Sequence, residues 1–456
     1  MKVLMVNKFL HPAGGAETYV FRLGEQLTKL GHRVEYFGMD REDRIVGNRW
    51  EIYTKSMDFH SGNPLGYLSY AFKIIYSAEA HRKMLEILRK YQPDLIHINN
   101  FNYQLTPSIL TAIQKYDREA SVRPRVIFTA HDYQLMCPNH MFYRPAEHVI
   151  CEACARGRFG ECTKHNCIHN SKVRSICGSI ESRYWHGRHI YDRLDGVICP
   201  SAFMAEKFEE SGLVKAPRKV LCNFVNLPER GNAPTGRGEP LGPDATDDNG
   251  ELLKSDAPTG CGESLGPDAT ADNRGILMSD AATASPAPYI LYFGRYSVEK
   301  GLSYLLEAVK ELPEIPVILA GGGPLEEEIN REIRAFPHIN NVGFLHGEEL
   351  QRMIRGARFT VYPSHWYENC PFSVLESLMY GTPVLGSRRG GIPELIREGE
   401  TGELYEPGNK EDLKRQIRTM WEDEERIRRY RENLKDIAFD TVETYTEKLL
   451  EFCEGL

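Results

Sequence analysis

The sequence lacks any run of about 18 apolar residues, the length a helix needs to cross a bilayer, so we expect no membrane-spanning helix. The opening KVLMVN is too short, and too soon followed by Asn7 and Lys8, for the core of a signal peptide. It is typical of a first β-strand instead. The formal net charge of −8 argues against general nucleic-acid binding. These absences predict a cytoplasmic protein that binds no nucleic acid.

Length and cysteine usage limit the class of protein further. A chain of 456 residues is too long for one compact core and indicates two large domains. Eleven cysteines would indicate a disulfide framework in a small secreted chain, but here they are spread through a large chain of cytosolic character. We therefore expect reduced thiols or a metal site.

Residues 1–228 alternate short apolar runs with helical patterns, which predicts a parallel sheet covered on both faces. Gly14 and Gly15 open the helix after the first run, and His131 lies at the end of the run RVIFTAHD. Open α/β sheets bind ligands at the carboxyl ends of their strands, so we expect these residues to share that edge. Ordinary turn chemistry for the glycines and a locally hydrogen-bonded histidine are the simpler alternatives.

A cysteine-rich loop at 137–177 interrupts this pattern. Cys151 and Cys154 form a C-x-x-C pair, and Cys162 and Cys167 follow. Four thiolates complete a tetrahedral shell, so these residues are candidate ligands of a structural zinc ion. Unliganded thiols and an iron–sulfur cluster are alternatives that the wider second spacing leaves open.

The stretch from Arg156 to Arg193 holds eight Lys or Arg against three acids, with Tyr184 and Trp185 among them. A basic surface with interfacial aromatics suits anionic lipid or an acceptor diphosphate. An ordinary solvated face with one packed aromatic pair explains the same residues.

Residues 229–287 look like a linker. Residues 233–256 are repeated as 257–280 with 17 of the 24 positions identical, and the segment is rich in Gly, Pro, Ala and Asp. It is too polar to bury the apolar surface that ordering requires, so we expect a flexible, duplicated connection between the domains.

A second strand-helix series fills residues 288–438 and predicts a second Rossmann-like domain. Its first strand leads into a turn that holds Gly294, Arg295 and Lys300. Arginine offers a planar fork and lysine a point charge, a pairing suited to a diphosphate, although a solvated basic turn would have the same composition.

Within this domain, the stretch HWYENCPFSVLESLMYG carries Glu368 and Glu376 on either side of Pro371. Proline favours the first turn of a helix, so Glu368 should precede the helix and Glu376 lie within it. The unpaired amides of a helix start attract anions. The simpler alternative is a charge that favours the helix dipole plus a solvated helix glutamate.

This part of the chain resembles the family-four retaining glycosyltransferases of the GT-B fold. The resemblance rests on the two glutamates, on PF after the first of them, and on the GTPV and GGIPE segments that follow, the latter at residues 390–394. The GGAE sequence at Gly14 is similar to the family's donor-side loop. The resemblance implies two facing domains, the first for the acceptor and the second for a nucleotide sugar. It also implies that a final helix, within residues 439–456, crosses back onto the first domain.

Roles follow from the resemblance. Glu368 would contact the transferred sugar and Glu376 would hold the nucleotide ribose, while Arg295 and Lys300 would bind the donor phosphates. His131 would face the reacting sugar. The other donor-binding residues expected here are Gly14, Gly15, Asn369, Cys370 and Phe372.

The implied activity is that of a retaining hexosyltransferase, which moves a sugar from a nucleotide-diphosphate donor to a glycan or lipid-linked acceptor in cell-surface polysaccharide biosynthesis. The sequence has no Asp-x-Asp pair, so we expect catalysis without a metal cofactor. The basic stretch suggests peripheral contact at the inner face of the membrane. A catalytically silent scaffold that binds nucleotide sugars is the alternative, against which the joint presence of the site residues argues.

Deleting residues 257–280, one copy of the repeat, should leave activity and stability within about twofold. The reason is that loop closure costs only about 0.6 kcal/mol for each doubling of loop length. Thermal unfolding and turnover of the deleted and full-length chains check this expectation. Loss of folding on deletion would show instead that the repeat is structural.

Overall fold

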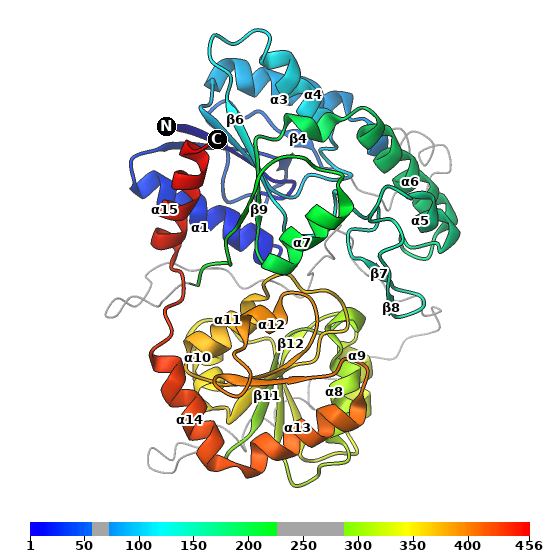
Figure 1. Cartoon of the computed structure of the whole chain (residues 1–456), viewed down its shortest axis with the longest axis vertical. Coiled ribbons are helices and arrows are strands. Elements are labelled where there is room, and N and C mark those ends of the chain that lie inside the picture. The colour runs from blue at the N-terminus through cyan, green and yellow to red at the C-terminus, as the bar shows by residue number, and fades with distance from the viewer. Residues whose placement is uncertain (57–72, 226–286) are drawn as a thin grey trace, which may run out of the picture.

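The computed structural model describes residues 1–56, 73–225 and 287–456, and Figure 1 shows two α/β domains that face each other. Each domain is built around a sheet of six strands, whose described pairings are all parallel. The predicted architecture of two facing, doubly wound parallel-sheet domains is confirmed. The linker predicted at 229–287, with its repeat, lies outside the described residues except for its last position.

The first sheet has the strand order β10-β9-β6-β5-β1-β2, so the direction of winding reverses between β1 and β5. Strands β1, β5 and β9 are almost wholly buried because helices cover both faces, which explains why the apolar runs do not alternate with polar residues. The strands are β1 (Lys2–Val6), β2 (Arg33–Phe37), β5 (Leu95–Ile98), β6 (Arg125–Thr129), β9 (Gly196–Cys199) and β10 (Arg218–Val220).

The second sheet has the order β13-β12-β11-β14-β15-β16 and reverses between β11 and β14. Its central strands are buried in the same way, so the two domains repeat one design. The strands are β11 (Ile290–Arg295), β12 (Val317–Gly322), β13 (Ile339–Gly343), β14 (Phe359–Tyr362), β15 (Val384–Ser387) and β16 (Gly402–Tyr405).

Helices fill the crossovers between strands, and their ends carry recognisable caps. The Ser77 side chain accepts a hydrogen bond from the Ala80 amide at 3.1 Å to start one helix, and the Ser201 side chain accepts from the Met204 amide at 3.1 Å to start another. The helices are α1 (Gly15–Lys29), α3 (Ala78–Tyr91), α4 (Ser108–Tyr116), α5 (Gly160–Lys164), α6 (Lys172–Gly187), α7 (Ala202–Ser211), α8 (Leu302–Val309), α9 (Glu326–Ile333), α10 (Gly347–Gly356), α11 (Phe372–Met379), α12 (Ile392–Leu395), α13 (Lys410–Glu422), α14 (Glu424–Lys435) and α15 (Val442–Glu454).

The last helix, α15, returns from the second domain and lies beside α1 of the first (Figure 1). Tyr445 and Leu449 of α15 are buried in the same apolar cluster as Tyr19 and Leu23 of α1. The hydroxyl groups of Tyr19 and Tyr445 are also 2.8 Å apart. The chain therefore crosses between the domains twice, and its C-terminal end is held by packing on the first domain.

The cysteine-rich loop folds as an addition to the first domain. It contains a two-stranded hairpin, β7 (Tyr143–Arg144) and β8 (Val149–Ile150), followed by α5 and α6. In Figure 1, α5 and α6 lie at the right-hand edge of the first domain, and β7 and β8 extend from there toward the second domain. Among the residues that the structure describes, no helix has the length and apolar character that crossing a bilayer requires.

Candidate active site

The two sheets direct the carboxyl ends of their strands toward each other, and the sequence-predicted residues lie between them. In the first domain, Gly15 begins α1 soon after β1, and His131 lies two residues after β6. In the second, Arg295 ends β11 and Glu368 lies in the loop between β14 and α11. Ligands of open α/β sheets bind at such edges, so this interdomain space is the candidate site.

The start of α1 touches the start of α11 across the domain boundary. A Cβ atom on Gly15 would lie 2.9 Å from Cδ2 of Phe372, so the Phe372 ring would have to shift to admit a side chain there. Glycine at this position thus permits the close approach of Phe372 from the second domain. This contact brings the turn at Gly14 and Gly15 into one site with residues 368–371, the loop before α11, which we call the donor loop.

Arg295 is the unpaired cation of the site. Within the described ranges its guanidinium has no hydrogen-bond or ion-pair partner, and its Nε is buried. The neighbouring Gly294 lies near α11, since a Cβ placed on it would be 3.8 Å from Oγ of Ser373. No side chain caps α11 at Pro371. The strand end that carries Arg295 thus lies next to an uncapped helix start, and a guanidinium and free helix amides both attract an anionic ligand.

Glu368, by contrast, is fully engaged. It is only 6% exposed, and its Oε1 accepts hydrogen bonds at 2.6 Å from Trp366 Nε1, at 2.8 Å from Lys300 Nζ and at 3.0 Å from Ser364 Oγ. The Tyr362 hydroxyl donates a fourth, at 3.2 Å. The sequence analysis predicted none of these hydrogen bonds. Lys300 in particular is 68 positions away in sequence and reaches Glu368 from the turn after β11.

This ion pair decides the charge state of Lys300. Burial on its own would lower the pKa of Lys300, but the adjacent Glu368 carboxylate, together with Tyr362 and Glu299, holds the pKa well above its usual value. Lys300 is therefore charged at neutral pH, and its charge is offset by Glu368. Of the two cations predicted to bind phosphate, Arg295 is the one without a carboxylate partner among the described residues.

The GGIPE segment packs against the backbone of Glu368 and Asn369. Gly390 has a φ of +57°, and a Cβ there would lie 2.7 Å from the Glu368 amide nitrogen. The Gly391 amide donates to the Glu368 carbonyl at 2.6 Å, and a Cβ on Gly391 would collide with the Asn369 carbonyl. Glycine is required at both positions because the backbones pack directly on each other.

Glu394 of the same segment reaches across to the first domain. Its carboxylate accepts hydrogen bonds from the amides of Ala202 at 2.7 Å and Phe203 at 2.6 Å, the first residues of α7. A carboxylate at a helix N-terminus is favoured by both the free amides and the helix dipole. The Asn369 side chain makes a second such link, donating to the His131 carbonyl at 2.7 Å. Both links escaped prediction, since neither spans a recognisable sequence motif.

His131, whose carbonyl accepts the hydrogen bond from Asn369, has a neutral side chain. Burial lowers its pKa to about 3, so the imidazole carries no charge at physiological pH. Its Nε2 is 2.9 Å from Oδ1 of Asn99, an acceptor, so Nε2 carries the proton and Nδ1 is free to accept. The Tyr19 ring packs edge-on at 4.9 Å, and through Tyr19 the imidazole is supported by Tyr445 of α15.

Glu376 lies in the second turn of α11, half-buried, and no hydrogen bond of its carboxylate is found among the described residues. Burial raises its pKa to about 7. A desolvated carboxyl group without a partner is a candidate for ligand binding, because hydroxyl groups of a ligand would replace the lost hydration.

The cysteine-rich loop does not form the predicted metal shell. Cys154, Cys162 and Cys167 are buried in one cluster with Phe159, whereas Cys151 is half-exposed. In the described part of the chain, no three Cys, His, Asp or Glu side chains are arranged to hold one metal ion. The structural zinc therefore stays a prediction that this geometry does not support.

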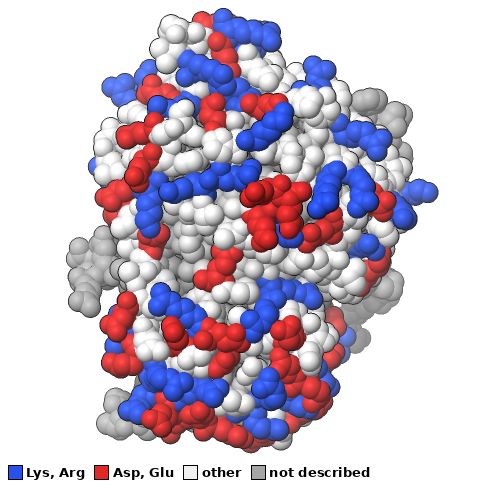
Figure 2. Space-filling model, viewed as in Figure 1, with Lys and Arg blue, Asp and Glu red and all other residues white. Residues whose placement is uncertain are grey.

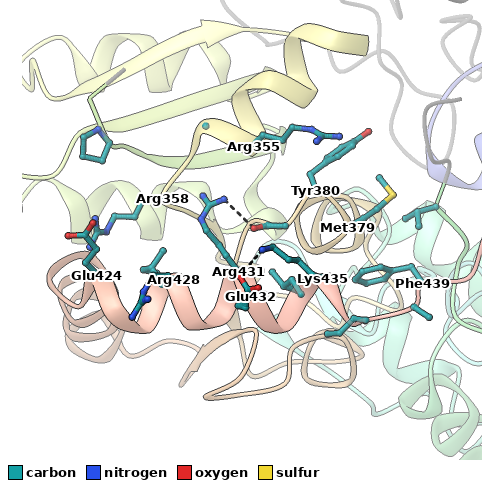
Figure 3. Close-up of a pocket in the computed structure, with 18 of the residues that line it drawn as sticks. Arg355, Arg358, Met379, Tyr380, Glu424, Arg428, Arg431, Glu432, Lys435 and Phe439 are labelled. Carbon is teal, nitrogen blue, oxygen red and sulfur yellow. Dashed lines mark hydrogen bonds and ion pairs between the residues drawn. The ribbon is translucent and has the colours of Figure 1, made fainter. Parts of the chain in front are cut away.

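A separate groove of about 1550 Å³ lies between α14 and the C-terminal end of α11 (Figure 3). Its lining includes Arg355, Arg358 and Arg431, together with Met379 and Phe439. None of the predicted site residues is among those that line it. The groove is thus at the opposite end of α11 from the candidate site.

Two family models match the chain. The model described as Glycosyltransferase Family 4 matches residues 13–229, and the one described as Glycosyl transferases group 1 matches residues 276–437. Together they cover both domains.

Curated relatives match over shorter stretches. Sulfoquinovosyl transferase SQD2 of Arabidopsis thaliana is 36% identical over 141 residues, which are 30% of this chain and 27% of that protein. O-antigen chain mannosyltransferase C of Escherichia coli is 30% identical over 149 residues, 32% of this chain and 40% of that protein. The chain thus matches well under half of the length of either relative.

Solved structures match over the whole chain. Sucrose-phosphate synthase from Thermosynechococcus elongatus has a TM-score of 0.63 at 18% identity, covering 100% of this chain and 98% of that one. HepE of Anabaena, solved in complex with UDP, has a TM-score of 0.63 at 16% identity and covers 100% of both chains. At such identities the likeness shows the fold alone.

The raised pKa of Glu376 gives a pH-dependent stability. The folded protein keeps this carboxyl protonated up to about pH 7, whereas the unfolded chain ionises it near its ordinary value. Wild type therefore loses stability as the pH rises between these values, and Glu376→Gln should not. We expect the variant to gain roughly 1–3 kcal/mol over wild type at pH 8 and almost nothing near pH 4.5, measured by thermal unfolding.

Glu447 of α15 is exposed and supplies the control. The difference in unfolding free energy between Glu447→Gln and wild type should be the same at pH 4.5 and pH 8. A gain for Glu376→Gln that is equal at both pH values would contradict the raised pKa.

Proposed function

The chain belongs to the family-four glycosyltransferases, and from this premise we propose that it is a retaining enzyme that uses a nucleotide-diphosphate sugar. The proposed acceptor is a glycan or glycolipid of cell-surface polysaccharide biosynthesis. The observation that carries the proposal is a pair of groups that have no partner among the described residues. They are the guanidinium of Arg295, which ends β11 beside the start of α11, and the carboxyl of Glu376 in the second turn of α11.

These two groups suit the two ends of a nucleoside diphosphate. Arg295 and the free amides at the start of α11 would bind the diphosphate, and the Glu376 carboxylate would accept hydrogen bonds from the ribose hydroxyls. HepE of Anabaena was solved with UDP and with UDP-glucose, which supports a nucleotide-sugar donor here.

The chemical step requires stabilisation of the departing diphosphate. Negative charge builds up on the phosphate oxygens as the glycosidic bond breaks, and fixed positive groups aimed at that charge lower the barrier. Arg295 would supply most of this charge, because Lys300 is already balanced by Glu368. We propose that these groups do the work without a metal cofactor.

His131 and Glu368 would act on the sugar side. A neutral imidazole whose Nε2 proton is held by Asn99 can accept a hydrogen bond at Nδ1 but cannot deliver a proton. We therefore assign His131 a positioning role toward a sugar hydroxyl. Glu368 would orient Lys300 and, near the anomeric carbon, favour the cationic character that grows as the bond breaks.

We also propose that the protein works at the cytoplasmic face of a membrane, through α6. Four apolar residues of this helix are exposed at helical spacing: Val173 (66%), Ile176 (38%), Ile180 (49%) and Tyr184 (40%). Exposed cations flank them, and the acidic residue of α6, Glu181, is buried. Figure 2 shows Lys and Arg side chains at the edge of the first domain where α5 and α6 lie. An apolar stripe with cationic flanks suits an anionic lipid surface.

The proposed activity can be tested with variants that distinguish the roles of Glu368 and Glu376. A thermal-shift screen with UDP-, GDP- and ADP-sugars identifies the donor, and steady-state kinetics and calorimetry follow. Glu376→Gln should mainly weaken binding of the bare nucleoside diphosphate, because its ribose contacts exist before and during the reaction. Glu368→Gln should lower kcat by roughly 100-fold, about 2.7 kcal/mol of transition-state stabilisation, with nucleotide affinity held or raised.

Glu447→Gln again serves as the matched control and should match wild type in both measurements. The reverse pattern for the two site variants would overturn the assignment. Donor binding without any transfer, and without slow donor hydrolysis, would identify a silent nucleotide-sugar-binding scaffold instead.

The membrane proposal is tested by co-sedimentation with vesicles of phosphatidylcholine alone or with phosphatidylglycerol. We expect binding to the anionic vesicles only, reduced by added salt and at least fivefold weaker for the double variant Ile176→Ser, Ile180→Ser. Val122→Ser, at a position 78% exposed elsewhere in the first domain, is the control and should bind like wild type. Equal binding to neutral vesicles would contradict the role of the cations.

A further inference from the structure

Two cysteine thiols meet where the domains join. Cys222 follows β10 in the first domain, and Cys370 lies in the second, two residues after Glu368 and just before α11. Their Sγ atoms are 3.0 Å apart although the residues are 148 positions apart in sequence. A disulfide bond has an S–S length of about 2.05 Å, so the two sulfur atoms need to approach by only about 1 Å.

Asn223 holds the pair in this position. Its amide donates to Cys370 Sγ at 3.3 Å, and its side-chain Nδ2 donates to the Cys370 carbonyl at 2.9 Å. The cysteine of the second domain is thus fixed to the first-domain backbone beside Cys222. No rearrangement of either domain is needed to bring the thiols together.

The two thiols differ in character. Burial raises the pKa of Cys370, which is only 5% exposed. Cys222 is half-buried, and its contact with the Cys370 thiol lowers its pKa. Because Cys222 is the more exposed of the two thiols, a peroxide reaches it first, so Cys222 is the nucleophile of the pair and Cys370 the resolving thiol.

Small molecules have a route to this pair. Cys222 and Cys370 pack in one cluster with Val225, Met379 and Phe439. These three residues also line the groove between α14 and α11, and Figure 3 shows Met379 and Phe439 at one end of it. The thiols therefore lie one layer of side chains behind an open groove.

We propose that Cys222 and Cys370 form a thiol-oxidation site, at which hydrogen peroxide links the two domains through a disulfide bond. The Cys222 thiolate attacks the peroxide, the O–O bond breaks, and a sulfenic acid and water form. The Cys370 thiol then attacks the sulfenic sulfur, so that the S–S bond forms, the S–O bond breaks and a second water leaves. Two thiols and one hydrogen peroxide thus give one disulfide and two waters.

The disulfide acts on the donor loop. It ties residue 370 covalently to the first domain, and this residue connects Glu368 to the start of α11. Domain opening then has to carry the donor loop with it, so donor entry and product release slow down. This consequence for turnover rests on the proposed function, whereas formation of the bond does not.

The experiment uses the reduced full-length chain, treated with hydrogen peroxide and then alkylated. Peptide mass spectrometry should find a linked peptide pair containing Cys222 and Cys370, which a phosphine reductant removes. The oxidised protein should melt at a higher temperature than the reduced one, because the link closes a long loop of the unfolded chain. Turnover should fall at least fivefold and recover on reduction.

Variants separate this pair from the other cysteines. Cys222→Ser should abolish the linked peptide, the melting shift and the loss of turnover, and Cys370→Ser should do the same if it folds. Cys177→Ser, a half-buried cysteine of α6, should behave like wild type. Free alkylation of both thiols after peroxide treatment would overturn the proposal. So would loss of turnover that persists in Cys222→Ser. If no glycosyl transfer is measurable, the mass and melting readouts still decide the site.

Discussion

The buried carboxylate of Glu368 is the constraint on which the second-domain side of the site depends. A buried charge costs several kcal/mol unless it is paired and hydrogen-bonded, and here one oxygen receives four donors. Lys300 comes from the turn after β11 and the other three donors from the end of β14 and the loop that follows it. Satisfying this one carboxylate therefore fixes two loops relative to each other, and Gly390 and Gly391 complete the arrangement by packing on the backbone of the same residue.

The residues that follow Glu368 connect this arrangement to the other domain. Asn369 bonds to the His131 carbonyl, Cys370 meets Cys222 and Phe372 packs against Gly15. A short loop thus serves the donor side of the site and the domain interface at once. A change in the angle between the domains has to break or rearrange these contacts, so movement of the domains alters the geometry of the proposed donor site.

The sequence was sufficient to predict features that follow a repeating pattern and features that lie at the end of a strand or helix. Apolar runs without alternation predicted both parallel sheets. His131 follows the end of β6 as the sequence indicated, whereas Arg295, expected in the turn after its strand, is the last residue of β11. Contacts between distant loops were not predictable, because no periodic sequence pattern marks them. Examples are the ion pair of Lys300 with Glu368 and the hydrogen bonds of Glu394 to the first amides of α7. The C-x-x-C spacing suggested a metal, but spacing alone does not fix where side chains point, and Cys151 is half-exposed while the other three thiols are buried.

The distribution of charge along α11 defines what the site can hold. Lys300 is neutralised by Glu368, so the uncompensated positive charge is at Arg295 and at the uncapped start of the helix. Glu376 is four residues after Phe372, and at about 1.5 Å of rise per residue the two are roughly 6 Å apart along the helix axis. The ligand that we propose carries its negative charge at one end and hydroxyl groups about one helical turn away. A nucleoside diphosphate has this form, with its phosphates and its ribose joined in that order, whereas a simple phosphate would leave the desolvated Glu376 unsatisfied.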